Sequence, residues 1–149
     1  MDKLDRYRKI VRDTLLPYAQ LRFSNPKISN EAVFDEERDR YIVATVGWEG
    51  NDRRIYFNVI HVDIINGKIW IQYDGTEDGV GYAFEAAGVP KEDIVPAFHP
   101  ESVRPFTGYA VARTLTEQEG AEMGALIDAE LEATIARTDA LLSKNSLTR

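Results

Sequence analysis

The dipeptide Asn66-Gly67 constrains the fold of this chain more than any other feature. It separates two runs with strand character, residues 55–65 and 68–73. Asn and Gly both tolerate a positive φ, and a two-residue turn with that backbone matches the twist of two paired strands. The sequence therefore predicts a β-hairpin centred on this dipeptide.

The hairpin turn also fixes which residues face each other. With Asn66 and Gly67 in the turn, Asp63 lies opposite Trp70, and His61 lies opposite Gln72. One face of the hairpin is then apolar and predicts a core; it carries Ile60, Val62, Ile64, Ile69, Ile71 and Tyr73. The other face is polar around one tryptophan; it carries His61, Asp63, Lys68, Trp70 and Gln72. A sheet with one solvated face is expected.

The length of 149 residues, with 44% hydrophobic residues, suits one ordinary core and is short for two. We expect one domain over residues 1–113 and a helical extension over residues 114–149. The chain has no cysteine, which excludes disulfides and thiolate zinc sites.

The charge is uneven along the chain. Eleven Lys/Arg face ten Asp/Glu through Arg54, and seven face fifteen from Ile55 onward, which gives the net charge of −7. A surface that follows DNA needs clustered cations, so direct DNA binding is not expected. The N-terminus has no apolar signal core, and no run is long enough to span a bilayer. A cytoplasmic protein without a membrane segment is expected.

The first half of the chain predicts a helix followed by strands. Residues 2–21 have one apolar helical stripe, with Asp2 as N-cap, and Pro26 follows the helix. The stripe consists of Leu4, Tyr7, Val11, Leu15 and Tyr18. Residues 32–35 and 40–48 predict two strands, the second with alternating Ile42, Ala44, Val46 and Trp48. Together with the hairpin they predict an antiparallel meander sheet.

The second half predicts short helices and then a long one. A short helix with Val80 and Phe84 on its apolar side ends at Gly88, and a turn of helix starts at Pro90. Ile94 and Val95 are expected in the core, and residues 106–112 are expected to form a last short strand. Thr116 and Glu119 have capping-box spacing, and residues 121–142 predict an extra C-terminal helix with one apolar stripe. That helix is expected to pack on the domain or to form a homo-oligomer, and residues 143–149 are expected to fray.

His61 and Asp63 lie two residues apart on one strand and share a face. They suit an acid/base pair or two metal ligands, or else a surface cluster in which Asp63 pairs with Lys68. No nucleophile or cofactor pattern accompanies them, so we expect no catalytic residue and no cofactor. A partner-binding patch around Trp70 is the preferred interpretation; its residues are His61, Asp63, Lys68, Trp70 and Gln72.

The segment after the hairpin has the spacing of a calcium loop. Positions one, three, five, six and twelve of that spacing are Asp74, Thr76, Asp78, Gly79 and Glu85. The segment follows a strand rather than a helix, and position eight is Gly81 instead of an aliphatic residue. We therefore predict a turn leading into a helix, whose positive end favours acidic side chains, and keep a metal loop as the alternative.

Several motifs together closely resemble the XisI family, the fdxN element excision controlling factors. The likeness covers about residues 4–112 and is carried by residues 7–8, 18–19, 33–39, 46–48, 61–79, 87–95 and 106–112. It departs from the family at Tyr73, Pro105, Gly108 and from Thr116 onward. The resemblance implies an α+β fold of the XisI-like type and control of site-specific DNA excision together with an XisH-like protein.

The resemblance leaves three hypotheses for the function. The first is a non-enzymatic accessory factor that acts through contacts with the XisH-like partner. The second is an antitoxin-like cap or inhibitor of a nuclease partner. The third is a metal-dependent enzyme that uses His61, Asp63, Asp74 and Asp78.

Overall fold

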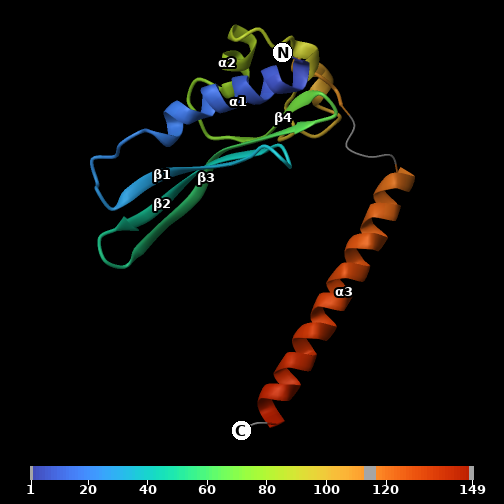
Figure 1. Cartoon of the computed structure of the whole chain (residues 1–149). Helices are drawn as coiled ribbons and strands as arrows, with labels where there is room; N and C mark the ends of the chain where they lie inside the picture. Colours follow the sequence, from blue (N-terminus) through green and yellow to red (C-terminus); the bar gives the residue numbers. More distant parts are fainter. Residues whose placement is uncertain (1, 113–116, 148–149) are drawn as a thin grey trace. The chain divides into compact units, whose positions relative to one another are not determined.

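The computed structural model describes residues 2–112 and 117–147, and its contacts divide the chain into two units, residues 1–112 and 113–149 (Figure 1). The first unit contains α1 (Lys3–Ala19), β1 (Ile28–Asp35), β2 (Arg40–Glu49), β3 (Arg53–Ile65), β4 (Lys68–Asp74), α2 (Val80–Ala86), the 3-10 helix η1 (Lys91–Asp93), β5 (Ile94–Val95) and the 3-10 helix η2 (Arg104–Phe106). The second unit contains α3 (Glu117–Leu147). The predicted α+β class with an N-terminal helix is confirmed.

The strands form one sheet in the order β1-β2-β3-β4-β5. The first four strands are antiparallel and joined by short turns, as predicted for a meander. β5 was not predicted as a strand, and it pairs in parallel with β4. Two parallel neighbours need a long crossover connection, and residues 75–93 with α2 provide it. The sheet is therefore mixed rather than purely antiparallel.

α1 lies across one face of the sheet (Figure 1). Its N-cap is Asp2, as predicted, because the Asp2 Oδ1 accepts a hydrogen bond of 2.8 Å from the Asp5 N–H. Tyr7, Val11 and Leu15 are fully buried against the sheet, whereas Leu4 at the start of the stripe is exposed. Helical spacing thus identified the packing side of α1 correctly except in its first turn.

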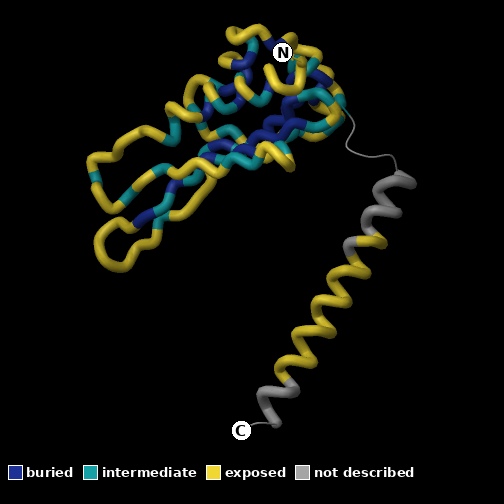
Figure 2. Tube along the Cα trace, in the orientation of Figure 1, coloured by how far each residue is buried: buried dark blue, intermediate teal, exposed yellow. Residues whose placement is uncertain are grey.

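The core lies between the helices and β2, β3 and β4, where Figure 2 shows the buried residues gathered. On β2 the buried side chains are Tyr41, Val43 and Thr45. The predicted apolar alternation, from Ile42 to Trp48, lies on the opposite face. Both faces of β2 carry apolar residues, so the alternation alone could not tell which face is covered. The register decides this, because Tyr41 pairs with the buried Val62.

The central hairpin forms as predicted. Asn66 and Gly67 have φ values of 50° and 75°, and the register holds from the Ile65–Lys68 pair to the Val62–Ile71 pair. Beyond that point a β-bulge shifts the register.

The bulge changes two predicted positions. His61 pairs with Tyr73 instead of Gln72, so Gln72 is the extra residue of β4. Tyr73, expected in the core, is 51% exposed. Residues Ile60, Val62, Ile64, Ile69 and Ile71 of the predicted core face are all buried. The hydrophobic pattern does not reveal the bulge, because an inserted residue changes pairing without changing composition.

The predicted strand over residues 106–112 is wrong. This segment contains the end of η2 and irregular chain, and the Ala110 N–H donates to the Ile94 carbonyl at 2.9 Å. Pro105 cannot donate a ladder hydrogen bond, and Gly108 has a φ of 80°, so the segment cannot run as a continuous strand. It lies along β5 instead.

α3 runs to Leu147, five residues past the predicted end at Leu142, and the fraying expected over residues 143–149 stays a prediction. Thr116 of the predicted capping box lies outside the described residues. The apolar residues Leu126, Leu131, Ile135 and Leu142 are exposed (Figure 2). None of the described helices combines the length and the apolar character that crossing a bilayer requires.

Candidate functional site

His61 and Asp63 of β3 contact each other on the face of the sheet opposite α1. The His61 Nε2 and the Asp63 Oδ1 are 2.9 Å apart. The other carboxylate oxygen, Oδ2, accepts a hydrogen bond of 3.2 Å from the Gln72 amide and lies 3.0 Å from Nη1 of Arg40. The sequence prediction thus placed three of these four side chains together correctly.

The cation that pairs with Asp63 is Arg40 rather than the predicted Lys68. Arg40 is the direct neighbour of Asp63 in the pairing of β2 with β3. Lys68 instead acts electrostatically on Asp93, whose carboxylate also binds Lys3 and Tyr7 of α1. The hairpin register relates only β3 to β4, so it could not predict that Arg40 of β2 pairs with Asp63 of β3.

Asp63 is a buried carboxylate whose charge is compensated. Its side chain is 5% exposed and has three polar partners. A buried charge is tolerated when it is paired and hydrogen-bonded, so these three partners offset the cost of burying the Asp63 carboxylate. His61 and Gln72 are partly exposed and line a shallow hollow of about 400 Å³ together with Tyr73. His61 and Gln72 form this rim, and Arg40, whose side chain is 51% exposed, is also open to a partner.

Trp70, the predicted centre of the partner-binding patch, is 5% exposed. Val95 and Ala110 pack against it, and the guanidinium of the buried Arg104 lies over its ring. The expectation of an exposed tryptophan is therefore wrong. The covering segment, residues 97–112, follows β5 in the chain, and no local pattern around Trp70 indicates it.

The exposed apolar surface lies farther along the same sheet face, on β1, β2 and β3. We define the open sheet face by six residues: Val33, Ile42, Ala44, Val46, Trp48 and Tyr56. Within residues 2–112 no helix covers it, since α1 packs on the other side (Figure 1).

Cross-strand pairing makes the open sheet face continuous. Val33 pairs with Ile42, and Val46 pairs with Tyr56, which is 69% exposed. Trp48 is also exposed, and the Arg54 guanidinium lies 5.3 Å from its ring centroid. The sequence analysis identified Ile42, Ala44, Val46 and Trp48 as one alternating side of the strand and assigned that side neither to the core nor to solvent. The charged and polar neighbours Glu31 and Asn58 on this face were a signal that it is solvated.

The loop after β4 folds as a capped turn. The Asp74 Oδ1 accepts hydrogen bonds from the Thr76 N–H at 2.9 Å and from its hydroxyl at 2.5 Å, and the Asp74 Oδ2 accepts one of 2.9 Å from the Val80 N–H. Glu85, the last residue of the calcium spacing, instead accepts a hydrogen bond of 2.7 Å from the Tyr109 hydroxyl. The Asp74 oxygens thus hold the turn and the start of α2, whereas Glu85 links α2 to Tyr109.

The four residues of the metal-enzyme hypothesis do not converge. Asp74 pairs with Ile60 and therefore lies on the core side of the sheet, whereas His61 and Asp63 lie on the other side. Asp78 is exposed in the loop before α2. In the part of the chain that the structure describes, no three His, Asp or Glu side chains form a group that could hold a metal ion.

The family model described as "XisI protein" matches residues 1–111. The chain belongs to the XisI family. The curated proteins give no match. The family match ends one residue before the boundary between the two units, so the XisI part is the α+β unit and α3 follows it.

Two solved structures of XisI proteins resemble this chain, both from Anabaena variabilis ATCC 29413. The fdxN element excision controlling factor XisI is 35% identical, and the match covers 74% of this chain and 100% of that one with a TM-score of 0.66. A XisI-like protein is 38% identical, with 73% and 99% covered and a TM-score of 0.69. The XisI fold of the first unit is thereby established.

Proposed function

We propose that this chain is a non-enzymatic accessory factor that controls excision of a DNA element by binding a protein partner. The similarity to an fdxN element excision controlling factor supports the role in excision. The family resemblance favours an XisH-like protein as the partner. The partner docks on the open sheet face and on the neighbouring rim of His61 and Gln72.

The open sheet face is the observation that carries this proposal. Val33 is exposed beside Ile42 at one end of this face, and Trp48 and Tyr56 are exposed on neighbouring strands at its other end. The opposite face of the same strands packs on α1. Continuous exposed apolar surface marks interaction sites, and tryptophan and tyrosine are enriched among residues that dominate binding. We therefore place the partner-binding patch around Trp48 and Tyr56 rather than around Trp70.

The charge of the chain also favours a protein partner. The net charge is −7, and from Ile55 onward acidic residues outnumber basic ones by fifteen to seven. An acidic surface repels phosphates and attracts basic protein surfaces. Excision control through a bound protein therefore needs no DNA contact by this chain.

Co-purification with an XisH-like protein tests the proposal. The double variant Val33→Glu, Tyr56→Glu places two charges on the open sheet face without touching the core. We expect its affinity for the partner to fall at least tenfold, since losing a central interface residue costs about 2 kcal/mol. Leu16→Glu is the matched control, because Leu16 is an exposed apolar residue of α1, on the other side of the sheet.

The thermal midpoint of each variant shows whether it is folded. A folded double variant that binds the partner as tightly as the unaltered chain contradicts the proposed docking face. A loss of binding in Leu16→Glu alone would place the contact on the helical side instead.

A further inference from the structure

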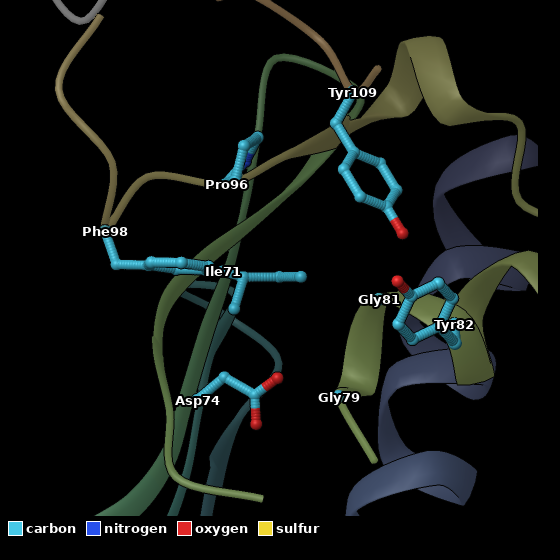
Figure 3. A pocket seen from close by; sticks show the side chains of 8 residues that line it. All are labelled: Ile71, Asp74, Gly79, Gly81, Tyr82, Pro96, Phe98 and Tyr109. Atoms are coloured by element: carbon cyan, nitrogen blue, oxygen red, sulfur yellow. The ribbon is translucent and has the colours of Figure 1, made fainter. Parts of the chain in front are cut away.

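A small cavity lies between the sheet and α2, on the side opposite the His61 and Asp63 cluster. Its volume is about 200 Å³. Pockets for drug-sized ligands and cofactors have about 300–1,000 Å³, so this cavity is sized for one side chain of another molecule. Figure 3 shows its lining, in which the Asp74 carboxylate points toward the space beside Ile71.

Three aromatic rings border the cavity. Tyr82 on α2 is 71% exposed, Phe98 is exposed in the segment after β5, and Tyr109 lies beyond η2. The Tyr109 hydroxyl is held by Glu85 at 2.7 Å, which fixes that ring at the wall. Burial, followed by the hydrogen bond to Glu85, raises the pKa of Tyr109, so the ring stays neutral. Aromatic faces carry negative potential and attract cations.

Negative charges predominate around the cavity, and one cation, Lys91, lies 3.7 Å from the Glu85 carboxylate. Residues 74–90 contain four carboxylates and no lysine or arginine; the carboxylates are Asp74, Glu77, Asp78 and Glu85. Asp74 lines the cavity itself, and Glu77 and Asp78 are exposed in the loop that leads to it. A cation bound in the cavity would contact aromatic faces and a carboxylate. Electrostatic attraction is stronger there than in water, because the cavity lining is mostly apolar.

A glycine keeps the cavity open. A Cβ at Gly81 would lie 3.2 Å from the Tyr109 hydroxyl oxygen and 3.6 Å from Cδ1 of Ile71. Any side chain at this position would fill the space between α2 and the cavity wall. Because Gly81 has no side chain, the space between α2, Ile71 and Tyr109 stays open.

We propose that this aromatic pocket binds one lysine or arginine side chain of a protein partner. The aliphatic part of such a side chain contacts Ile71 and the ring of Phe98, and its cationic end is directed to Tyr82 and Asp74. The pocket is separate from the open sheet face, so this inference does not depend on the proposed docking there.

Amide chemical shifts of the full chain in a titration test the proposal without any partner. The probes are N-acetyl-lysine N-methylamide and N-acetyl-arginine N-methylamide, with the uncharged norleucine and citrulline analogues as matched controls. We expect saturable shifts of the Gly79 and Gly81 amides with at least one cationic probe, at concentrations up to tens of millimolar. The uncharged analogues should bind at least about threefold more weakly, as expected for cation–π and charge attraction.

Variants locate the binding in the pocket. Tyr82→Leu keeps apolar area but removes the ring and should weaken the cationic probe about two- to fivefold, whereas Tyr82→Phe should keep its affinity. Phe106→Leu should have no effect, because Phe106 is an exposed aromatic residue that does not line the pocket. Equal binding of charged and uncharged probes, or no shift at Gly79 and Gly81 with any probe, overturns the proposal.

Discussion

The guanidinium of Arg104 lies over the indole of Trp70, with its Cζ 5.7 Å from the ring centroid. Arg104 is buried and donates to three carbonyl oxygens, those of His99 at 3.0 Å, Ala112 at 2.6 Å and Ala97 at 3.4 Å. One side chain thus organises residues 97–112 and seals Trp70 from solvent. This arrangement removes Trp70 from any interaction surface.

Replacing Arg104 by alanine should release this segment. Three carbonyls lose a charged donor and the ring loses its cover, so we expect the free energy of unfolding to fall by about 2–3 kcal/mol. Trp70 should then become exposed, and its emission should shift to longer wavelength. The measurement uses the Trp48→Phe background, in which Trp70 is the remaining tryptophan.

Arg38→Ala serves as control, because the Arg38 side chain is largely exposed. It should leave the emission wavelength unchanged and should change the free energy of unfolding by no more than about 0.5 kcal/mol. Unshifted emission in the Arg104 variant would show that packing of Val95 and Ala110 alone covers Trp70.

Asp63→Ala should destabilise the sheet. The change leaves Arg40, His61 and Gln72 without their common acceptor, and we expect urea denaturation to show a loss of about 2–3 kcal/mol. Asp13→Ala is the matched control, since Asp13 forms an exposed ion pair with Lys9, and exposed pairs contribute about 0–1 kcal/mol. Equal effects of the two variants would contradict the structural role of Asp63.

Tyr7 connects α1 to η1, because its hydroxyl donates a hydrogen bond to the Asp93 carboxylate. Burial, followed by this bond, raises the pKa of Tyr7 to about 12. The stability from the protonated hydroxyl is complete below pH 10 and is lost as the pH rises toward 12. Tyr7→Phe should cost about 1.5–3 kcal/mol at neutral pH and should flatten this alkaline loss relative to the unaltered chain. Parallel pH curves for the two proteins would contradict the assignment.

Asp93 governs stability on the acid side. Burial acts to raise its pKa, but the hydrogen bond from Tyr7 and the Lys3 ammonium at 2.9 Å outweigh burial and lower the pKa. The carboxylate therefore contributes stability above the unfolded pKa of about 4, and this is lost as the pH falls through the lower folded value. Asp93→Asn should reduce the slope of stability against pH below about 4, and the exposed neighbour Glu92→Gln should reduce it less.

The predicted homo-oligomer can be tested on α3. Leu131→Lys with Ile135→Lys places charges on the apolar stripe, and we expect the mass from light scattering to fall to that of a single chain if the unaltered protein associates through this helix. Ala129→Lys with Ala133→Lys lies on the other side of the same helix and should leave the mass unchanged. A single-chain mass for the unaltered protein would refute association through α3.

Several elements could be predicted from interactions between residues that are close in the sequence. Asn66-Gly67 required a two-residue turn, and Asp2 could cap α1, because both effects act within a few residues. The placement of His61, Asp63 and Gln72 on one face of the hairpin also followed from strand geometry near the turn. Helical spacing was enough to place Tyr7, Val11 and Leu15 in the core.

Pairing between distant segments decided the rest. The buried side of β2, the bulge at Gln72, the parallel strand β5 and the burial of Trp70 all depend on which segments meet, and apolar residues on both faces of a strand do not encode that choice. The sequence alone determined the hairpin, the class of fold and the family. Only the tertiary structure decided which apolar surface is exposed, because the covering residue Arg104 lies thirty-four positions after Trp70.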